Sequence, residues 1–126
     1  MKIYKSAEDY LEMMLMLQEK CGYIRSVDIA LELHVKKPSV SYATKRLREN
    51  GYITMDAGSM ITLTDKGREV AERIYTRHKL LTQYLTAIGV DPDTARADAC
   101  KIEHDLSDES FEAIRRQYGK TASRTL

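Results

Sequence analysis

Residues 35–50, VKKPSVSYATKRLREN, are the stretch of the chain from which the fold can be worked out. Pro38 suits the first turn of a helix, where its missing N–H would have no partner in any case. Val40, Ala43 and Leu47 then recur at helical spacing and form one narrow apolar stripe. The stretch therefore predicts a short helix with a single buried side.

The opposite side of this helix is basic and rich in hydroxyl groups. Five basic residues and no acidic residue occur between positions 36 and 48. Such a helix suits contacts to DNA phosphates and to base edges in the major groove, although basic runs are also common on solvated surfaces. The candidate DNA-binding residues are Lys36, Lys37, Ser39, Ser41, Tyr42, Lys45 and Arg46.

The preceding segment predicts a second short helix. Residues 26–33 begin with Ser26, which can cap a helix, and place Val27, Ala30 and Leu31 on one side, which we expect to face inward. A connection of four residues leads from this helix into the basic one. Two short helices joined in this way make a helix-turn-helix, whose second helix enters the DNA groove.

A hairpin follows the two helices. Residues 52–55 and 60–63 are β-prone runs on either side of residues 56–59, where Gly58 supplies the turn. Helix, helix and hairpin in about forty residues predict a winged helix-turn-helix. This context favours DNA contact over the interpretation of the basic helix as a solvated surface.

Length and composition limit the remaining possibilities. The chain has 126 residues, which is one domain or one small domain with an appendage. It contains no run of about 18 apolar residues that would span a membrane, and its start lacks the apolar core of a signal peptide. Two cysteines, Cys21 and Cys100, are too few for a disulfide framework. We therefore expect a cytoplasmic protein.

The net charge of +1 hides an asymmetry along the chain. Residues 91–112 hold eight acidic residues against Arg96 and Lys101, whereas the basic segment lies in the first half. This division predicts nucleic acid as the partner of one part and cations or another kind of partner for the other.

Several helices are predicted outside the winged helix. The first is apolar along much of its surface and ends at Gly22. A long helix begins at a Thr64 cap and ends at Gly89, and a further helix begins at Asp91-Pro92. The apolar positions of the first helix are Tyr10, Leu11, Met14, Leu15 and Leu17, and those of the long helix are Val70, Ile74, Leu81, Leu85 and Ile88.

The last helix is predicted to open at Ser107. The long helix exceeds what a winged helix needs and suggests a strut toward a dimer interface. We therefore expect a mainly α chain, with a winged helix-turn-helix DNA-binding domain in residues 1–71 and a helical dimerisation and metal-binding domain in residues 72–126.

Potential metal ligands cluster on the helix after Pro92. Cys100, Glu103 and His104 stand at i, i+3 and i+4, so their side chains share one helical face. A thiolate, a carboxylate and an imidazole on one face are a set of metal donors. Taken alone, Cys100 is better explained as a small buried hydrophobic residue than as a ligand.

Further donors occur on two other predicted helices. Asp9 and Glu12 have the i, i+3 relation on the first helix, and His78 lies near the middle of the long one. Asp9 could instead be a carboxylate favoured by a helix N-terminus, and His78 could be a histidine satisfied at an interface. The spacing does not decide whether these helices meet.

Over residues 6–118 the chain resembles the diphtheria-toxin-repressor family of metal-dependent transcriptional repressors, most closely its manganese-regulator branch. The resemblance is carried by SAEDYLE at 6–12, LTDKG at 63–67, RHKLL at 77–81, IGVD at 88–91 and ACKIEHDLS at 99–107. It implies that the activating divalent metal is held by Asp9, Glu12, His78, Cys100, Glu103 and His104.

The resemblance leaves the cognate metal open between Mn²⁺ and Fe²⁺, with Co²⁺ or Zn²⁺ possible in vitro. Asp9 and Glu12 match the manganese branch, whereas Cys100 matches the iron-responsive branch. Hard oxygen donors suit Mn²⁺, and a thiolate shifts preference toward Fe²⁺, Co²⁺ or Zn²⁺.

The function implied is a homodimeric repressor that controls metal-ion homeostasis. Metal would tie the first helix to the long helix and to the helix of Cys100, and so set the spacing of the two recognition helices on a palindromic operator of double-stranded DNA. The alternative is a regulator that uses Cys100 to sense oxidation or an organic effector. An enzyme is not expected, because the chain offers no nucleophile elbow, Gly-rich loop or His-Glu-x-x-His pattern.

Overall fold

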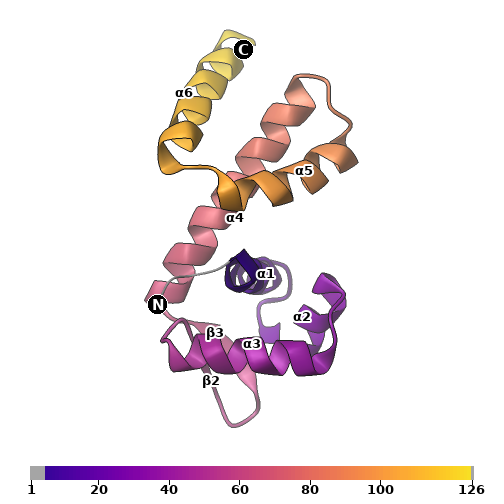
Figure 1. The fold of residues 1–126 in the computed structure, drawn as a ribbon, viewed down its shortest axis with the longest axis vertical. Helices are drawn as coiled ribbons and strands as arrows, with labels where there is room; N and C mark the ends of the chain where they lie inside the picture. The colour runs from indigo at the N-terminus through magenta and orange to yellow at the C-terminus, as the bar shows by residue number, and fades with distance from the viewer. Residues whose placement is uncertain (1–4, 126) are drawn as a thin grey trace. The chain divides into compact units, whose positions relative to one another are not determined.

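The computed structural model describes residues 5–125, with side chains described as far as Tyr118. Its elements are α1 (Lys5–Cys21), β1 (Ile24–Arg25), α2 (Ser26–Leu33), α3 (Lys37–Glu49), β2 (Ile53–Met55), β3 (Met60–Leu63), α4 (Asp65–Ala87), α5 (Pro92–Asp105) and α6 (Asp108–Thr125) (Figure 1). The predicted mainly α class, a winged helix-turn-helix followed by helices, is confirmed.

The chain divides into two compact units, which are described separately below. The first unit comprises Met1–Arg73 and the second Ile74–Leu126. The first holds α1, the sheet, α2, α3 and the start of α4, while the second holds the rest of α4 with α5 and α6.

Helix α1 supplies much of the core of the first unit. All five of its predicted apolar positions are buried, and Leu11 and Met14 have no exposed surface. At about 25 cal/mol per Å² of apolar surface, burial of side chains of this size is the main stabilising term for such a helix. The helix ends at Cys21, and Gly22 follows with a φ of 81° that suits glycine.

The predicted inward face of α2 is wrong. Val27 and Leu31 are 44% and 68% exposed, whereas Ile29 is fully buried. The helix has eight residues, most of them apolar, so stripes can be drawn along more than one side. Ser26 is also not the cap, because it is the first helical residue and Arg25 occupies the cap position.

Helix α3 buries the narrow stripe that its sequence predicts. Val40 and Leu47 are buried and Ala43 is half-buried. Thr44, which was not among the predicted apolar positions, is buried as well. Its hydroxyl donates to the Ser41 carbonyl oxygen at 3.1 Å. That hydrogen bond allows a polar side chain on the inner side of the helix.

The predicted hairpin is confirmed, and it belongs to a sheet of three antiparallel strands in the order β1-β3-β2. Ile53 pairs with Leu63, and Ile24 of the unpredicted strand β1 pairs with Ile61. The turn between β2 and β3 is held by Asp56, whose Oδ1 accepts from the backbone N–H groups of Gly58 and Met60 at 2.8 and 3.0 Å.

Helix α4 begins with the predicted Thr64 cap. The Thr64 hydroxyl accepts from the Gly67 N–H at 3.2 Å and donates to the Gly51 carbonyl oxygen at 2.6 Å. Gly67 lies so close to the preceding loop that a Cβ placed on it would be 1.9 Å from the carbonyl oxygen of Tyr52. The absence of a side chain at this position therefore lets α4 leave the sheet at close range.

The apolar positions predicted for α4 are buried to different extents. Ile74 and Leu81 are buried, Val70 and Leu85 are half-buried, and Ile88 is 64% exposed beyond the helix end. None of the described helices is long and apolar enough to cross a membrane.

The predicted starts of the two helices of the second unit are confirmed. Asp91 Oδ2 accepts from the backbone N–H groups of Asp93 and Thr94 at 3.1 and 3.3 Å, and so caps α5. Ser107 Oγ accepts from the N–H of Ser110 at 3.1 Å at the start of α6.

Replacing Gly67 with alanine should lower the free energy of unfolding by about 1–3 kcal/mol, the usual cost of overpacking. Helix propensity alone would have the opposite sign, because alanine is favoured over glycine in helices by about 1 kcal/mol. Urea unfolding measures the difference. Gly58→Ala is the control, since its Cβ would meet only Asp56 Oδ1 at an ordinary 3.4 Å. A Gly67→Ala protein as stable as wild type would contradict the close approach.

Candidate metal centre and DNA-recognition helix

A carboxylate with no exposed surface, that of Glu103, lies at the centre of the second unit's polar cluster. Glu103 stands in the last turn of α5, and its Oε2 is 2.8 Å from Nδ1 of His78 on α4. Its other oxygen, Oε1, is 3.4 Å from Nε2 of His104, whose side chain is 1% exposed. Two imidazole nitrogens from two helices thus converge on one buried carboxylate.

This donor set fits a divalent metal. Glu103 Oε1 is buried and accepts no hydrogen bond from the residues that the structure describes. A buried carboxylate is costly unless a cation or hydrogen-bond donors compensate its charge. Imidazole nitrogen and carboxylate oxygen together suit Mn²⁺, Fe²⁺, Co²⁺ and Zn²⁺.

Cys100 lies on the same helix, three residues before Glu103, and it is exposed. The interpretation of this residue as a small buried hydrophobic side chain is therefore wrong. An exposed thiol one helical turn from the buried carboxylate is not explained by packing.

The two carboxylates expected from the first helix lie in the first unit. Asp9 is half-buried and Glu12 is buried, both on α1. Since α1 is already helical at Lys5, Asp9 stands beyond its first turn, where the helix dipole gives a carboxylate little stabilisation. The neighbouring Glu8 accepts from Arg73 Nη2 at 3.2 Å.

Arg77, which precedes His78 on α4, was not among the residues predicted from the sequence to serve the site. Its guanidinium is buried and donates to the backbone oxygens of Glu103 and Leu106. The only signal in the sequence was its position next to a candidate ligand, since main-chain acceptors leave no pattern of residue types.

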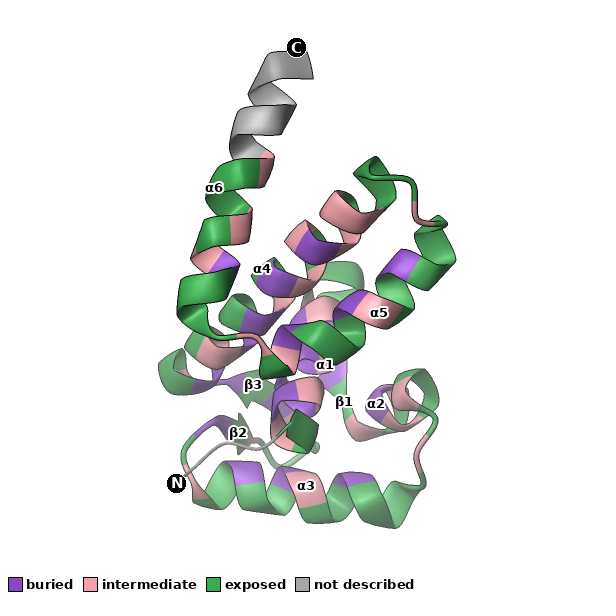
Figure 2. Cartoon of the chain, turned by 45° about the horizontal axis from the view of Figure 1, so that its top comes forward, coloured by how far each residue is buried: buried purple, intermediate pink, exposed green. Residues whose placement is uncertain are grey.

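The residues predicted to contact DNA lie on the exposed side of α3. All seven are exposed, and Figure 2 shows this side of α3 in green, with buried residues at intervals opposite (Figure 2). Lys36 is the N-cap residue, and no described side chain caps the helix. Two lysines at the positive end of a helix dipole are unfavourable on their own, whereas a backbone phosphate at that end would be attracted by both.

Arg46 also has a partner within its own helix, the side chain of Tyr42. Its Nη1 donates to the Tyr42 hydroxyl at 3.0 Å, and its guanidinium lies 5.7 Å from the centre of the Tyr42 ring. A cation in the last turn also suits the helix dipole. Both side chains are nevertheless exposed, so the pair remains accessible to a ligand.

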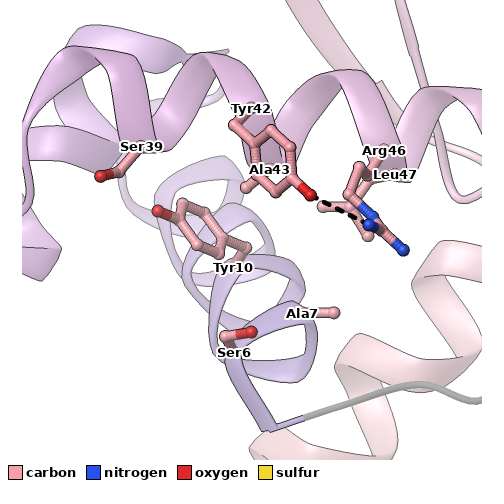
Figure 3. Close-up of a pocket in the computed structure, with 8 residues that line it drawn as sticks. All are labelled: Ser6, Ala7, Tyr10, Ser39, Tyr42, Ala43, Arg46 and Leu47. Atoms are coloured by element: carbon pink, nitrogen blue, oxygen red, sulfur yellow. Dashed lines mark hydrogen bonds between the residues drawn. The ribbon is translucent and has the colours of Figure 1, made fainter.

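A pocket of about 380 Å³ lies between α1 and α3 beside this pair (Figure 3). Its walls include Ser6, Ala7 and Tyr10 of α1 and Ser39, Tyr42 and Arg46 of α3. Burial raises the pKa of Tyr10 above its ordinary value, so its hydroxyl stays neutral. The residues of α1 were not predicted to lie beside the recognition helix, because only the tertiary packing brings them there.

Two family models match most of the chain. Residues 2–57 match the iron dependent repressor N-terminal DNA binding domain, and residues 64–124 match the iron dependent repressor metal binding and dimerisation domain. The members of this family are transcriptional regulators rather than enzymes.

Relatives agree with these matches. The chain is 38% identical over 113 residues to an uncharacterised HTH-type transcriptional regulator of Methanocaldococcus jannaschii, covering 88% of this chain and 90% of that one. It is 39% identical over 109 residues to the HTH-type transcriptional regulator MntR of Bacillus subtilis, covering 86% and 77%.

The solved structure of the manganese regulator SloR is similar with a TM-score of 0.79 and 28% identity. The match covers 94% of this chain but only 55% of SloR, so the chain spans about half the length of that protein. With both domains and a relative of this similarity matched, the chain belongs to the iron-dependent repressor family, that is, the diphtheria-toxin-repressor family of metal-dependent transcriptional repressors, in its manganese-regulator branch.

Proposed function

We propose that the protein is a cytoplasmic, homodimeric repressor that binds a palindromic operator when it holds Mn²⁺ or Fe²⁺, and that it controls metal-ion homeostasis. The observation that carries the proposal is the buried Glu103 carboxylate, with His78 Nδ1 at 2.8 Å and His104 Nε2 at 3.4 Å. Family membership supports both the metal and the DNA.

The proposed ligands in the second unit are His78, Cys100, Glu103 and His104. The sequence adds Asp9 and Glu12 of α1 to the set, and this part of the proposal rests on the sequence alone. A bound divalent ion would supply the positive charge that a buried carboxylate requires. The metal binding and dimerisation model that matches residues 64–124 supports a ligand role for this segment and a dimer.

The proposed DNA contacts are the seven exposed residues of α3 and of the turn before it. Their support is the exposure of that side and the two lysines at an N-terminus that no described side chain caps. We assign phosphate contacts to Lys36 and Lys37, and base-edge or phosphate contacts to the others. The N-terminal DNA binding domain model covers all of them.

Metal and DNA should each raise the affinity of the protein for the other by the same factor, because the coupling free energy is reciprocal. The test is a titration of the purified chain with Mn²⁺, Fe²⁺, Co²⁺ and Zn²⁺. DNA affinity is read on a duplex that the protein selects from a random-sequence library. We expect DNA affinity to rise about 5- to 150-fold with the cognate metal. Metal binding that leaves DNA affinity unchanged for all four ions would contradict the proposed function.

The double variant Lys45→Ala/Arg46→Ala should bind the selected duplex at least about tenfold more weakly, which corresponds to about 1.4 kcal/mol. Lys36→Ala should mainly reduce the salt dependence, since it removes a phosphate contact. Fluorescence anisotropy over a range of salt concentrations measures both effects.

Arg115→Ala/Arg116→Ala is the matched control for this experiment. It removes two exposed cations from α6 and changes the net charge equally. If the control and the α3 variant weaken binding to the same extent, the effect reflects overall charge and the assignment to α3 is wrong.

Cys100→Glu should shift metal preference toward Mn²⁺ over Co²⁺ and Zn²⁺, because it replaces a soft sulfur donor with a hard oxygen. In the wild type, a thiolate ligand must lose its proton, so metal affinity should rise with pH across the thiol titration. Isothermal titration of wild type, Cys100→Glu and Cys100→Ala with Mn²⁺ and Co²⁺ gives the ratio of the two affinities.

Cys21→Ala is the control for thiol chemistry elsewhere, since Cys21 is also exposed but lies in the first unit. The same ratio of Mn²⁺ to Co²⁺ affinity in all three proteins of the series would show that Cys100 is not a ligand.

A further inference from the structure

We propose that Arg77 is a positioning residue for the metal centre, which it serves by fixing the C-terminal turn of α5. The inference rests on the proposed function, since it concerns how Glu103 and His104 are presented to the metal. No part of it assigns Arg77 as a ligand, because a guanidinium has no lone pair to offer.

The contacts of Arg77 join three segments of the second unit. Its Nη1 donates to the carbonyl oxygens of Glu103 at 3.1 Å and of Leu106 at 2.5 Å, and its Nη2 donates to the carboxylate of Asp108. The guanidinium carbon lies 5.1 Å from the centre of the Phe111 ring. The residue is only 4% exposed. One side chain of α4 thus holds the end of α5 and the start of α6.

The hydrogen bonds from Arg77 to the end of α5 matter because of the main-chain groups that a helix leaves without partners at its C-terminus. The last four carbonyl groups of a helix have no partner within it, and the negative end of the helix dipole lies there. The planar guanidinium meets both needs at the end of α5, because its donors are arranged in a fixed fork and its charge is permanent. The Arg77 guanidinium therefore fixes both the residue at which α5 ends and the rotational orientation of α5 about its axis.

The rotational orientation of α5 about its own axis decides whether the candidate ligands meet. Arg77 binds the backbone of Glu103, while the side chain of Glu103 contacts His78, the residue that follows Arg77. A displacement of α5 by one residue would rotate its side chains by about 100° and turn the carboxylate away from His78. Two consecutive residues of α4 thus hold Glu103, Arg77 by its main-chain carbonyl group and His78 by its carboxylate.

The ion pair with Asp108 contributes less than the main-chain bonds. The Asp108 side chain is 79% exposed, and ion pairs in water contribute little. The bonds to the carbonyl groups of α5 are the ones that control the ligand-bearing turn. This distinction provides a control, because Asp108→Asn removes the ion pair and leaves those bonds in place.

The test compares wild type with Arg77→Lys and Arg77→Met in the full chain. Lysine keeps the charge and the apolar stem but not the fork, so Arg77→Lys should fold and lose part of the effect, with Arg77→Met losing more. We expect Mn²⁺ affinity by isothermal titration to fall about 10- to 100-fold, the range for residues that orient metal ligands. The Co²⁺ d–d absorption spectrum should also change shape, because it reports the arrangement of the ligands.

Ala95→Gly is the control for stability alone. Ala95 is fully buried on α5, two turns before Glu103, and glycine there weakens the helix without touching its C-terminal turn. Affinities are measured well below the melting temperature of every variant. If Arg77→Lys and Arg77→Met lose thermal stability but keep the wild-type Mn²⁺ affinity and Co²⁺ spectrum, Arg77 is only structural and the proposal is wrong.

The failure of the proposed function gives a different result in the same experiment. If the wild type binds neither Mn²⁺ nor Co²⁺, the metal centre itself is refuted. If wild type and Asp108→Asn bind both ions alike and only the Arg77 variants lose affinity, the positioning role is supported.

Discussion

The buried charge of Glu103 is the constraint on which the arrangement of the second unit depends. A carboxylate with no exposed surface costs several kcal/mol unless its surroundings compensate it. The imidazoles of His78 and His104 are among the groups that approach it, and Arg77 binds the main chain of the same residue. An apolar residue at position 103 would avoid this desolvation cost, and the buried glutamate is therefore the observation that supports the proposed cation site.

In the first unit, helix α3 favours ligands of the opposite charge, that is, anions. Helix α3 has two lysines at its N-terminus and no acid in its first turn, so this end favours anions. The inner side of the same helix is held by Val40, Thr44 and Leu47. Burial on one side and cations on the other leave the second side available for phosphate.

Local signals in the sequence predicted most of the fold, whereas contacts between distant segments were not predictable. The caps at Thr64 and Asp91 were recognised because their partners lie within three residues. The inward face of α2 was predicted wrongly, because eight residues are too few for periodicity to select one side. Spacing placed Glu103 and His104 on one face with Cys100, but burial differs among them: Glu103 has no exposed surface and Cys100 is exposed. Burial depends on the neighbouring helices, which spacing does not encode.

Two arginines one turn apart on α4 show what the structure adds to such a sequence. Arg73 and Arg77 are the same residue type on one helix, and each binds a segment that carries candidate ligands. Arg73 donates to Glu8 of α1 within the first unit, but its side chain is 47% exposed. Ion pairs of that kind contribute about 0–1 kcal/mol. Arg77 is 4% exposed and binds two main-chain carbonyl groups. Each buried carbonyl left unpaired costs about 1–3 kcal/mol, so the loss of Arg77 should cost more free energy than the loss of the Arg73–Glu8 ion pair. Burial and main-chain partners, rather than residue type or spacing, make the difference.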